Sequence, residues 1–127
     1  MLKWVVAAGV MLALPTMASA QDAAAGKKVF TKCAPCHAIG PGAKNKVGPE
    51  LNGILDRAAA SVEGFAYSDA LKKSGLKWDD ANLHKWLENP KALVPGPRMA
   101  FRGVKEEPER DDLIPNIESF NADGTNK

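Results

Sequence analysis

The 127-residue chain has little cysteine, little histidine and few aromatic residues: two Cys, two His, one Tyr and 6% aromatic side chains in all. Two cysteines are too few for a disulfide-rich secreted scaffold. Few aromatics and a near balance of 17 Lys and Arg against 15 Asp and Glu argue against a nucleic-acid-binding protein. So few large apolar side chains also predict that the chain alone buries only a modest core.

Long apolar runs are absent after residue 20. Before it, Lys3 precedes an apolar stretch from Trp4 to Leu14, and Ala-Ser-Ala occupies residues 18–20. This pattern predicts a cleaved secretory signal peptide over residues 1–20, followed by one domain over residues 21–127 and no membrane span after cleavage. The alternative is a retained membrane anchor. In a bacterium, cleavage would place the protein in the periplasm.

Charge is distributed unevenly along the chain. Residues 21–105 hold 14 Lys and Arg against 8 Asp and Glu, whereas residues 106–127 hold 2 against 7. Most of these side chains are expected to be solvated surface groups. Taken together, however, the asymmetry suits orientation toward an acidic partner.

The two cysteines lie close together, as Cys33 and Cys36, and His37 follows directly. A redox-active dithiol would need a βαβ pattern around the motif, which the sequence lacks. A zinc site would need a second pair of ligands, and His84 has no cysteine near it. The remaining interpretation of Cys-x-x-Cys-His is attachment of a c-type haem, with two thioether bonds and an imidazole beneath the iron. A haem would also supply the apolar body that the core lacks.

The pattern of apolar residues and helix caps predicts an all-α architecture of about four to five short helices and long loops. The segment 41–53 is rich in Gly, Pro and Asn and is expected to be a loop. Helices are expected over Ala23–Lys32, from Ser68 to Gly75, from the N-cap Asp79 to Pro90, and from about Pro108 through the sequence ERDDLI.

One methionine decides what such a haem could do. Met99 is the only methionine left after signal cleavage, and Pro95 and Pro97 stiffen its approach. The other candidates for the sixth iron ligand are His84 and the lysines. We interpret His84 as an ordinary helix histidine. A filled sixth position favours electron transfer, whereas an open one favours gas binding or peroxide chemistry.

Six stretches in order resemble class I cytochromes c, in particular the bacterial periplasmic type that is similar to mitochondrial cytochrome c. They are CAPCH (33–37), GPELNG (48–53), GFAYSDA (64–70), Trp78, KWLENPKALVPGPRMAF (85–101) and RDDLI (110–114). The resemblance covers nearly all of the chain between the signal peptide and Ile114. It implies the cytochrome c fold wrapped around one haem c per chain.

The resemblance also implies roles for individual residues. Cys33 and Cys36 match the thioether positions, His37 the proximal iron ligand and Met99 the distal one. Pro49 matches the residue whose carbonyl accepts the N–H of the proximal histidine ring. The positions that hydrogen-bond the haem propionates are matched by Arg57, Tyr67 and Trp78.

The implied function is that of a soluble monomeric one-electron carrier in a respiratory or photosynthetic chain, and not that of an enzyme. Basic residues that would steer redox partners to the haem edge are Lys32, Lys46, Lys91 and Arg98. Two alternatives remain at this point: a peroxidase or gas sensor with a labile methionine, and a Cys-x-x-Cys redox module without haem.

The sequence departs from the family pattern near the haem and at the C-terminus. Pro97, Leu71 and Trp86 replace a usual threonine, asparagine and tyrosine, and we expect a reduction potential at least as high as is usual. Pro115 is expected to end or kink the last helix, at a cost of about 3 kcal/mol in a continuous helix. Residues 116–127, with Asn116 at a normally aromatic position, are expected to form a loose tail.

Overall fold

The computed structural model describes residues 8–10 and 22–127, so the predicted signal peptide falls almost wholly outside the described residues. Within them the chain forms helices and no strand, as predicted. In order, these are α1 (Ala23–Val29), a 3-10 turn (Phe30–Lys32), α2 (Asp69–Lys73), α3 (Asp80–Glu88), α4 (Pro90–Leu93) and α5 (Glu107–Glu118). Among the described helices, none is both long and apolar enough to cross a membrane.

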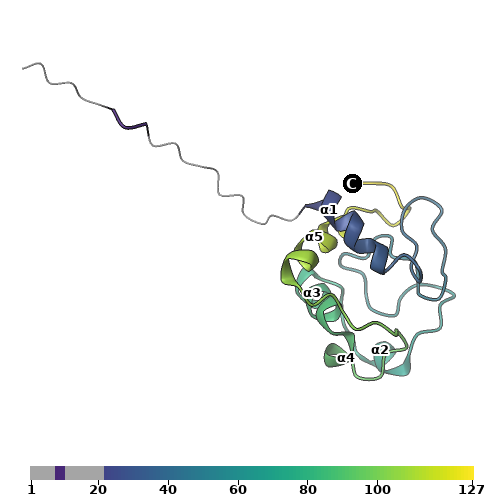
Figure 1. The fold of residues 1–127 in the computed structure, drawn as a ribbon. Coiled ribbons are helices and arrows are strands. Elements are labelled where there is room, and N and C mark those ends of the chain that lie inside the picture. Colours follow the sequence, from purple (N-terminus) through teal and green to yellow (C-terminus); the bar gives the residue numbers. More distant parts are fainter. Residues whose placement is uncertain (1–7, 11–21) are drawn as a thin grey trace, which may run out of the picture.

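The helices and the long loops occupy different sides of the molecule. Figure 1 shows α3, α4 and α5 along one side and the loops of residues 33–68 along the other. The helix α1 lies across α5 at one end, and α2 and α4 lie at the opposite end. The loops therefore face a continuous helical framework.

The crossing of α1 and α5 is close because a glycine lies at the contact. A Cβ on the buried Gly26 would collide with the backbone carbonyl of Asp112 and lie 2.9 Å from Cβ of Asn116. Side chains of α5 also hold α1: the Asp22 N–H donates to Oδ1 of Asp112 at 3.0 Å, and Asn116 Nδ2 donates to the Ala23 carbonyl at 3.1 Å. The departure at Asn116 thus ties the N-terminal helix in place.

The helix α3 forms as its caps and apolar spacing predict. The Asp79 carboxylate accepts a hydrogen bond from the Asn82 N–H at 2.7 Å, which satisfies a free donor at the helix start. Leu83 and Leu87, one helical turn apart, are both buried. Pro90 does not simply close this helix, because it opens the one-turn helix α4, where its missing N–H costs nothing.

The helix α5 continues through Pro115 to Glu118, so the helix does not end at that proline, which was one of the two expected outcomes. Proline removes one backbone hydrogen bond. Against that loss, Ile114 and Ile117 on either side are 1% and 4% exposed. Burying one such side chain stabilises the fold by about 1.5–3 kcal/mol, which offsets the lost hydrogen bond.

Residues 119–127 form a closed loop in place of the expected loose tail. The Lys127 N–H donates to the Ser119 carbonyl at 2.8 Å, and the Asn121 N–H donates to the Thr125 carbonyl at 2.7 Å. Gly124 is buried against the backbone of Gly40, at a positive φ of 86° that favours glycine. The C-terminal residues thereby cover the loop that follows the Cys-x-x-Cys-His motif.

Candidate haem-binding site

The Cys-x-x-Cys-His motif forms one tight turn after α1. The N–H groups of Cys36 and His37 both donate to the Cys33 carbonyl, at 3.0 and 2.9 Å. Both thiols are free and half-buried. This turn gathers two sulfurs and one imidazole within a single loop of backbone, as attachment of one haem requires.

The environment of Cys33 is unlike that of a redox-active dithiol. Burial raises the pKa of the Cys33 thiol to about 11, and the charge of Lys32 offsets only part of this effect. Reactive Cys-x-x-Cys pairs have lowered thiol pKa values because the thiolate is the attacking species. The local electrostatics therefore disfavour the alternative of a redox module without haem.

His37 has one ring nitrogen occupied and one left over. Its Nδ1 lies 2.7 Å from the Pro49 carbonyl oxygen, which is the contact that the family resemblance implies. A carbonyl can only accept, so Nδ1 carries the proton and Nε2 keeps its lone pair. Burial lowers the pKa of His37; the hydrogen bond to Pro49 opposes this effect, the charges of Arg57 and Lys46 add to it, and the net shift favours the neutral ring. A neutral imidazole with a free nitrogen is a metal ligand.

Gly48 sets the position of that ring. Its backbone lies so close to His37 that a Cβ at position 48 would collide with the imidazole. The same residue donates its N–H to the Cys36 carbonyl at 2.8 Å. The sequence indicated GPELNG as a loop and as part of the family resemblance, but did not reveal that Gly48 packs on the histidine.

Two of the three residues expected at the propionates, Arg57 and Trp78, are joined by a short stretch of paired backbone. The Trp78 N–H donates to the Arg57 carbonyl at 2.9 Å, and the Asp56 N–H donates to the Trp78 carbonyl at 2.8 Å. The Tyr67 hydroxyl accepts from the Val62 N–H at 3.0 Å, so its own proton stays free to be donated. Both Tyr67 and Trp78 are buried, at 7% and 6% exposure.

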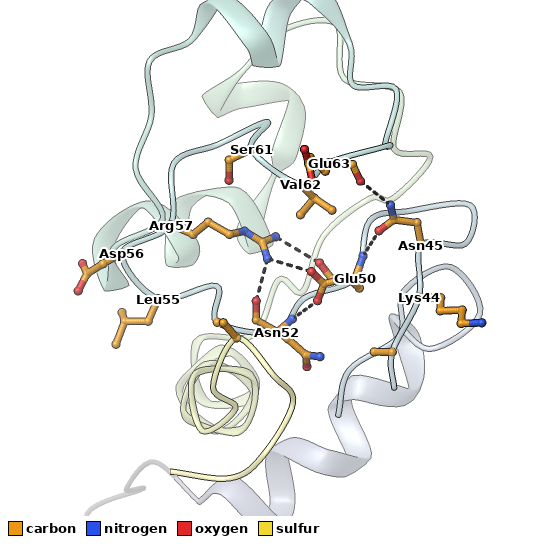
Figure 2. Close-up of a pocket in the computed structure, with 13 residues that line it drawn as sticks. Lys44, Asn45, Glu50, Asn52, Leu55, Asp56, Arg57, Ser61, Val62 and Glu63 are labelled. Carbon is orange, nitrogen blue, oxygen red and sulfur yellow. Dashed lines mark hydrogen bonds and ion pairs between the residues drawn. The ribbon is translucent and has the colours of Figure 1, made fainter. Parts of the chain in front are cut away.

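Arg57 belongs to a network that the sequence did not predict. It donates from Nη1 to the Asn52 carbonyl at 2.9 Å and from Nη2 to the Glu50 carbonyl at 3.2 Å, as Figure 2 shows. Its Nε is buried and has no partner among the described residues. Asn52 in turn exchanges hydrogen bonds with the backbone of Gly40, at 2.8 and 2.9 Å. Sequence reasoning missed Glu50 and Asn52, whose only signal was their place in GPELNG.

Arg57 and Glu50 also line a cavity of about 800 Å³ between the loops, together with Lys44 and Asn45. Asn45 links two of the segments that line the cavity: its Nδ2 donates to the Glu63 carbonyl at 3.2 Å, and its Oδ1 accepts from the Glu50 N–H at 3.0 Å. Neither His37 nor Met99 lines this space. The cavity is therefore separate from the side chains of the two expected iron ligands.

Met99 lies on the segment between α4 and α5, and this segment is fixed at both ends. Val94 is buried and bonds back to Pro90 at 3.0 Å, and the Val104 N–H donates to the Leu87 carbonyl at 2.6 Å. Met99 itself is half-buried. The nearby Phe101 packs against the apolar core. The sulfur is thus carried by a short tethered span.

His84 lies beside two carboxylates. Its Nε2 lies 3.6 Å from an Asp111 carboxylate oxygen and 3.9 Å from one of Asp80, between α3 and α5. Among the described residues, no group of three or more His, Cys, Asp or Glu side chains is arranged to hold a metal ion. The interpretation of His84 as a helix histidine agrees with these contacts.

The three departures near the site have different surroundings. Trp86 packs edge-on against Trp78, with ring centroids 5.3 Å apart. Leu71 packs against the core, where its apolar side chain belongs. Pro97 is half-buried, two residues from Met99.

Of the four basic residues expected at the haem edge, two have partners within the chain. Lys32 pairs with Glu109 at 3.1 Å, with both side chains about half exposed. Lys46 donates to the Ala34 carbonyl at 2.9 Å, across the Cys-x-x-Cys-His turn. All four, Lys91 and Arg98 included, are exposed.

The residues present fit a covalent haem. A neutral histidine with a free Nε2, two free thiols on the same turn and a buried arginine nitrogen without a partner would suit its iron, its vinyl groups and a carboxylate. The chain has no other cysteines that could compete for attachment.

No protein-family profile matches the chain, but individual known proteins do. Cytochrome c2 of Blastochloris viridis is 52% identical over 118 residues, 93% of each chain. Cytochrome c-550 of Bradyrhizobium diazoefficiens is 51% identical over 80% of this chain and 75% of its own. The chain belongs to the class I bacterial cytochromes c. Among solved structures, cytochrome cH from Methylobacterium extorquens superimposes with a TM-score of 0.71 at 46% identity, over 76% of this chain and 96% of its own.

Membership in this family establishes what the protein does. It is an electron carrier and not an enzyme, and it carries one haem c bound covalently through Cys33 and Cys36. The same relatives give no support to the peroxidase or sensor alternative. The predicted cytochrome c fold is confirmed.

Proposed function

We propose that this cytochrome c carries electrons in the periplasm with its haem iron held between His37 and Met99. When bound, the haem supplies one reversible Fe(III)/Fe(II) electron step. The residues of the chain fix its axial ligands, exclude water from it and present one edge to partners.

The observation that carries this proposal is the contact between His37 Nδ1 and the Pro49 carbonyl, 2.7 Å. It fixes the tautomer, and Gly48 fixes the plane of the ring. Such a hydrogen bond also makes an imidazole a stronger donor to a metal. Nε2 of His37 is the atom that would bind the iron.

Met99 is proposed as the second axial ligand because its segment is short and anchored at Val94 and Val104. A tethered thioether loses less conformational entropy when it binds a metal. Methionine ligation raises the reduction potential relative to harder ligands. A site filled on both faces transfers electrons and leaves no position open for a substrate.

Arg57, Tyr67 and Trp78 are proposed to donate hydrogen bonds to the propionates. Their support is the unpartnered Nε of Arg57, the free hydroxyl proton of Tyr67, and the backbone pairing of Arg57 with Trp78. Donors to a buried carboxylate stabilise its charge and hold the group in place.

Carbon monoxide binding to the reduced holoprotein tests the ligand set. We expect the wild-type iron to resist carbon monoxide, because both axial positions are filled, and the Met99→Ala variant to bind it readily. His84→Ala serves as the matched control and should behave as wild type. Equal binding by wild type and Met99→Ala would contradict the proposal.

We further propose that the exposed residues Lys32, Lys46, Lys91 and Arg98 attract an acidic redox partner to a monomeric carrier. Charge reversal at Lys91 or Arg98 should slow electron transfer to the anionic oxidant hexacyanoferrate(III) several-fold at low salt, and the effect should fade as salt is added. Lys127→Glu makes the same change of charge at the acidic end of the chain. A rate loss no larger than that of Lys127→Glu would contradict the proposal.

A further inference from the structure

Glu50 is one of eight acidic residues in the net-basic stretch of residues 21–105, and it faces Arg57. Its Oε1 lies 3.8 Å from Nη1 of Arg57, and the two side chains are only 22% and 18% exposed. Its Oε2 accepts the Asn52 N–H at 2.7 Å. Figure 2 shows the carboxylate and the guanidinium directed at each other across the cavity wall.

The backbone around the pair makes this arrangement rigid. Arg57 donates to the carbonyls of Asn52 and Glu50, and the Glu50 side chain holds the Asn52 N–H, which closes a ring of contacts over residues 50–57. The carboxylate therefore cannot swing away from the guanidinium without breaking a 2.7 Å hydrogen bond.

Arg57 lies close to the proposed iron ligand through two adjacent backbone carbonyls. Arg57 Nη2 donates to the Glu50 carbonyl at 3.2 Å, and the carbonyl oxygen of the preceding residue, Pro49, lies 2.7 Å from Nδ1 of His37. A positive charge near an iron disfavours the extra positive charge of Fe(III), and a carboxylate beside that charge opposes the effect.

We infer that Glu50 is a positioning residue that sets the reduction potential, by partly neutralising and orienting Arg57. The inference rests on the proposed role of Arg57 beside the haem. With Glu50 ionised, Arg57 favours Fe(II) less than it otherwise would. Loss of that single carboxylate should raise the potential without a change in the axial ligands.

Redox titration of the holoprotein tests this inference with variants matched for shape and charge. Glu50→Gln keeps an acceptor for the Asn52 N–H and removes only the charge. Glu63→Gln removes an exposed carboxylate from another wall of the same cavity. We expect Glu50→Gln to raise the midpoint potential clearly more than Glu63→Gln, with an unchanged visible spectrum. Glu50→Asp, which keeps the charge, should stay close to wild type.

Arg57→Gln separates the inference from the function on which it rests. We expect Arg57→Gln to lower the potential and Glu50→Gln to raise it less in the Arg57→Gln background than alone. If Arg57→Gln leaves the potential unchanged, the proposed role of Arg57 fails. If Arg57→Gln lowers it but Glu50→Gln shifts it no more than Glu63→Gln, or equally in both backgrounds, the inference about Glu50 is overturned.

Discussion

The helical framework and the loops that carry the site are held together by different forces. Where α1, α3 and α5 meet, apolar side chains dominate, and Leu113, Ile114 and Ile117 are almost fully buried. In the loops of residues 33–68, polar contacts dominate, such as His37 with Pro49 and Asn52 with Gly40.

Because of this difference, we expect the helical framework to determine stability and the loops to determine the properties of the iron site. Apolar burial is non-directional and tolerates variation, whereas a hydrogen bond fixes one atom at one distance. We therefore expect damage to the framework to lower the free energy of unfolding with little change at the iron. Damage to the loops should alter the iron site at a smaller cost in stability.

The largest effect is expected from Leu113→Ala in the framework. Leu113 is 0% exposed, so truncation removes its buried methyl groups and leaves a cavity. We expect a loss of about 2–5 kcal/mol in the free energy of unfolding of the holoprotein, measured by denaturant titration. The midpoint potential should hardly move. A large shift in potential with little loss of stability would contradict the assignment of stability to the framework.

Gly26→Ala should be the next most damaging change. The added Cβ would collide with the Asp112 carbonyl, and backbone on both sides leaves little room to adjust. We expect a loss of about 1–3 kcal/mol in unfolding free energy from such overpacking. Ala25→Gly, one residue away, is a control without added volume, and thermal unfolding compares the two. Equal stability of Gly26→Ala and wild type would show that α1 and α5 can separate without penalty.

Asn52→Ala tests the loops, and its loss of unfolding free energy should be similar to or smaller than that of Gly26→Ala. It leaves the N–H and carbonyl of the buried Gly40 without their partners, which costs about 1–3 kcal/mol. The Asn52 carbonyl that accepts from Arg57 remains in the variant, but the side-chain bonds to Gly40 that hold residue 52 in place are lost, so we expect a shift in midpoint potential that neither framework variant produces. Asn121→Ala, in the exposed C-terminal loop, is the control. An unshifted potential would argue against a loop-held site.

The smallest effect is expected from Glu118→Gln and appears only as a pH dependence. Burial, together with the negative charge of the nearby Asp80, raises the pKa of Glu118 to about 7 from 4.5, and the charge of Lys127 opposes only part of this effect. The folded state then binds a proton that the unfolded state has lost. Stability should therefore fall as the pH rises from about 4.5 to 7, and Glu118→Gln should flatten this slope. An identical slope for wild type and Glu118→Gln, in thermal melts at several pH values, would argue against a raised pKa of Glu118.

The sequence predicted the framework and the motif well, for physical reasons. Asp79 as N-cap, the turn-spaced Leu83 and Leu87, and Cys-x-x-Cys-His are local signals, and each produced the expected structure. The course of α5 past Pro115 was missed, because burial of Ile117 against other parts of the chain decides it.

The long-range polar contacts of the loops could not be predicted from the sequence either. Glu50 meets Arg57 and Asn52 meets Gly40 through contacts that no periodicity encodes. The resemblance to class I cytochromes c supplied Pro49 and Arg57, but it assigned no role to the Glu50 carboxylate. Long-range polar contacts are therefore the part of the site that required the structure.

Whether His37 and Met99 hold the iron can be decided from the far-red absorption spectrum of the oxidised holoprotein. A methionine sulfur bound to Fe(III) gives a weak charge-transfer band in that region. We expect this band in wild type and in His84→Ala, and its loss in Met99→Ala. A wild-type protein without the band and with a high-spin spectrum, or loss of the band in His84→Ala alone, would contradict this ligand set.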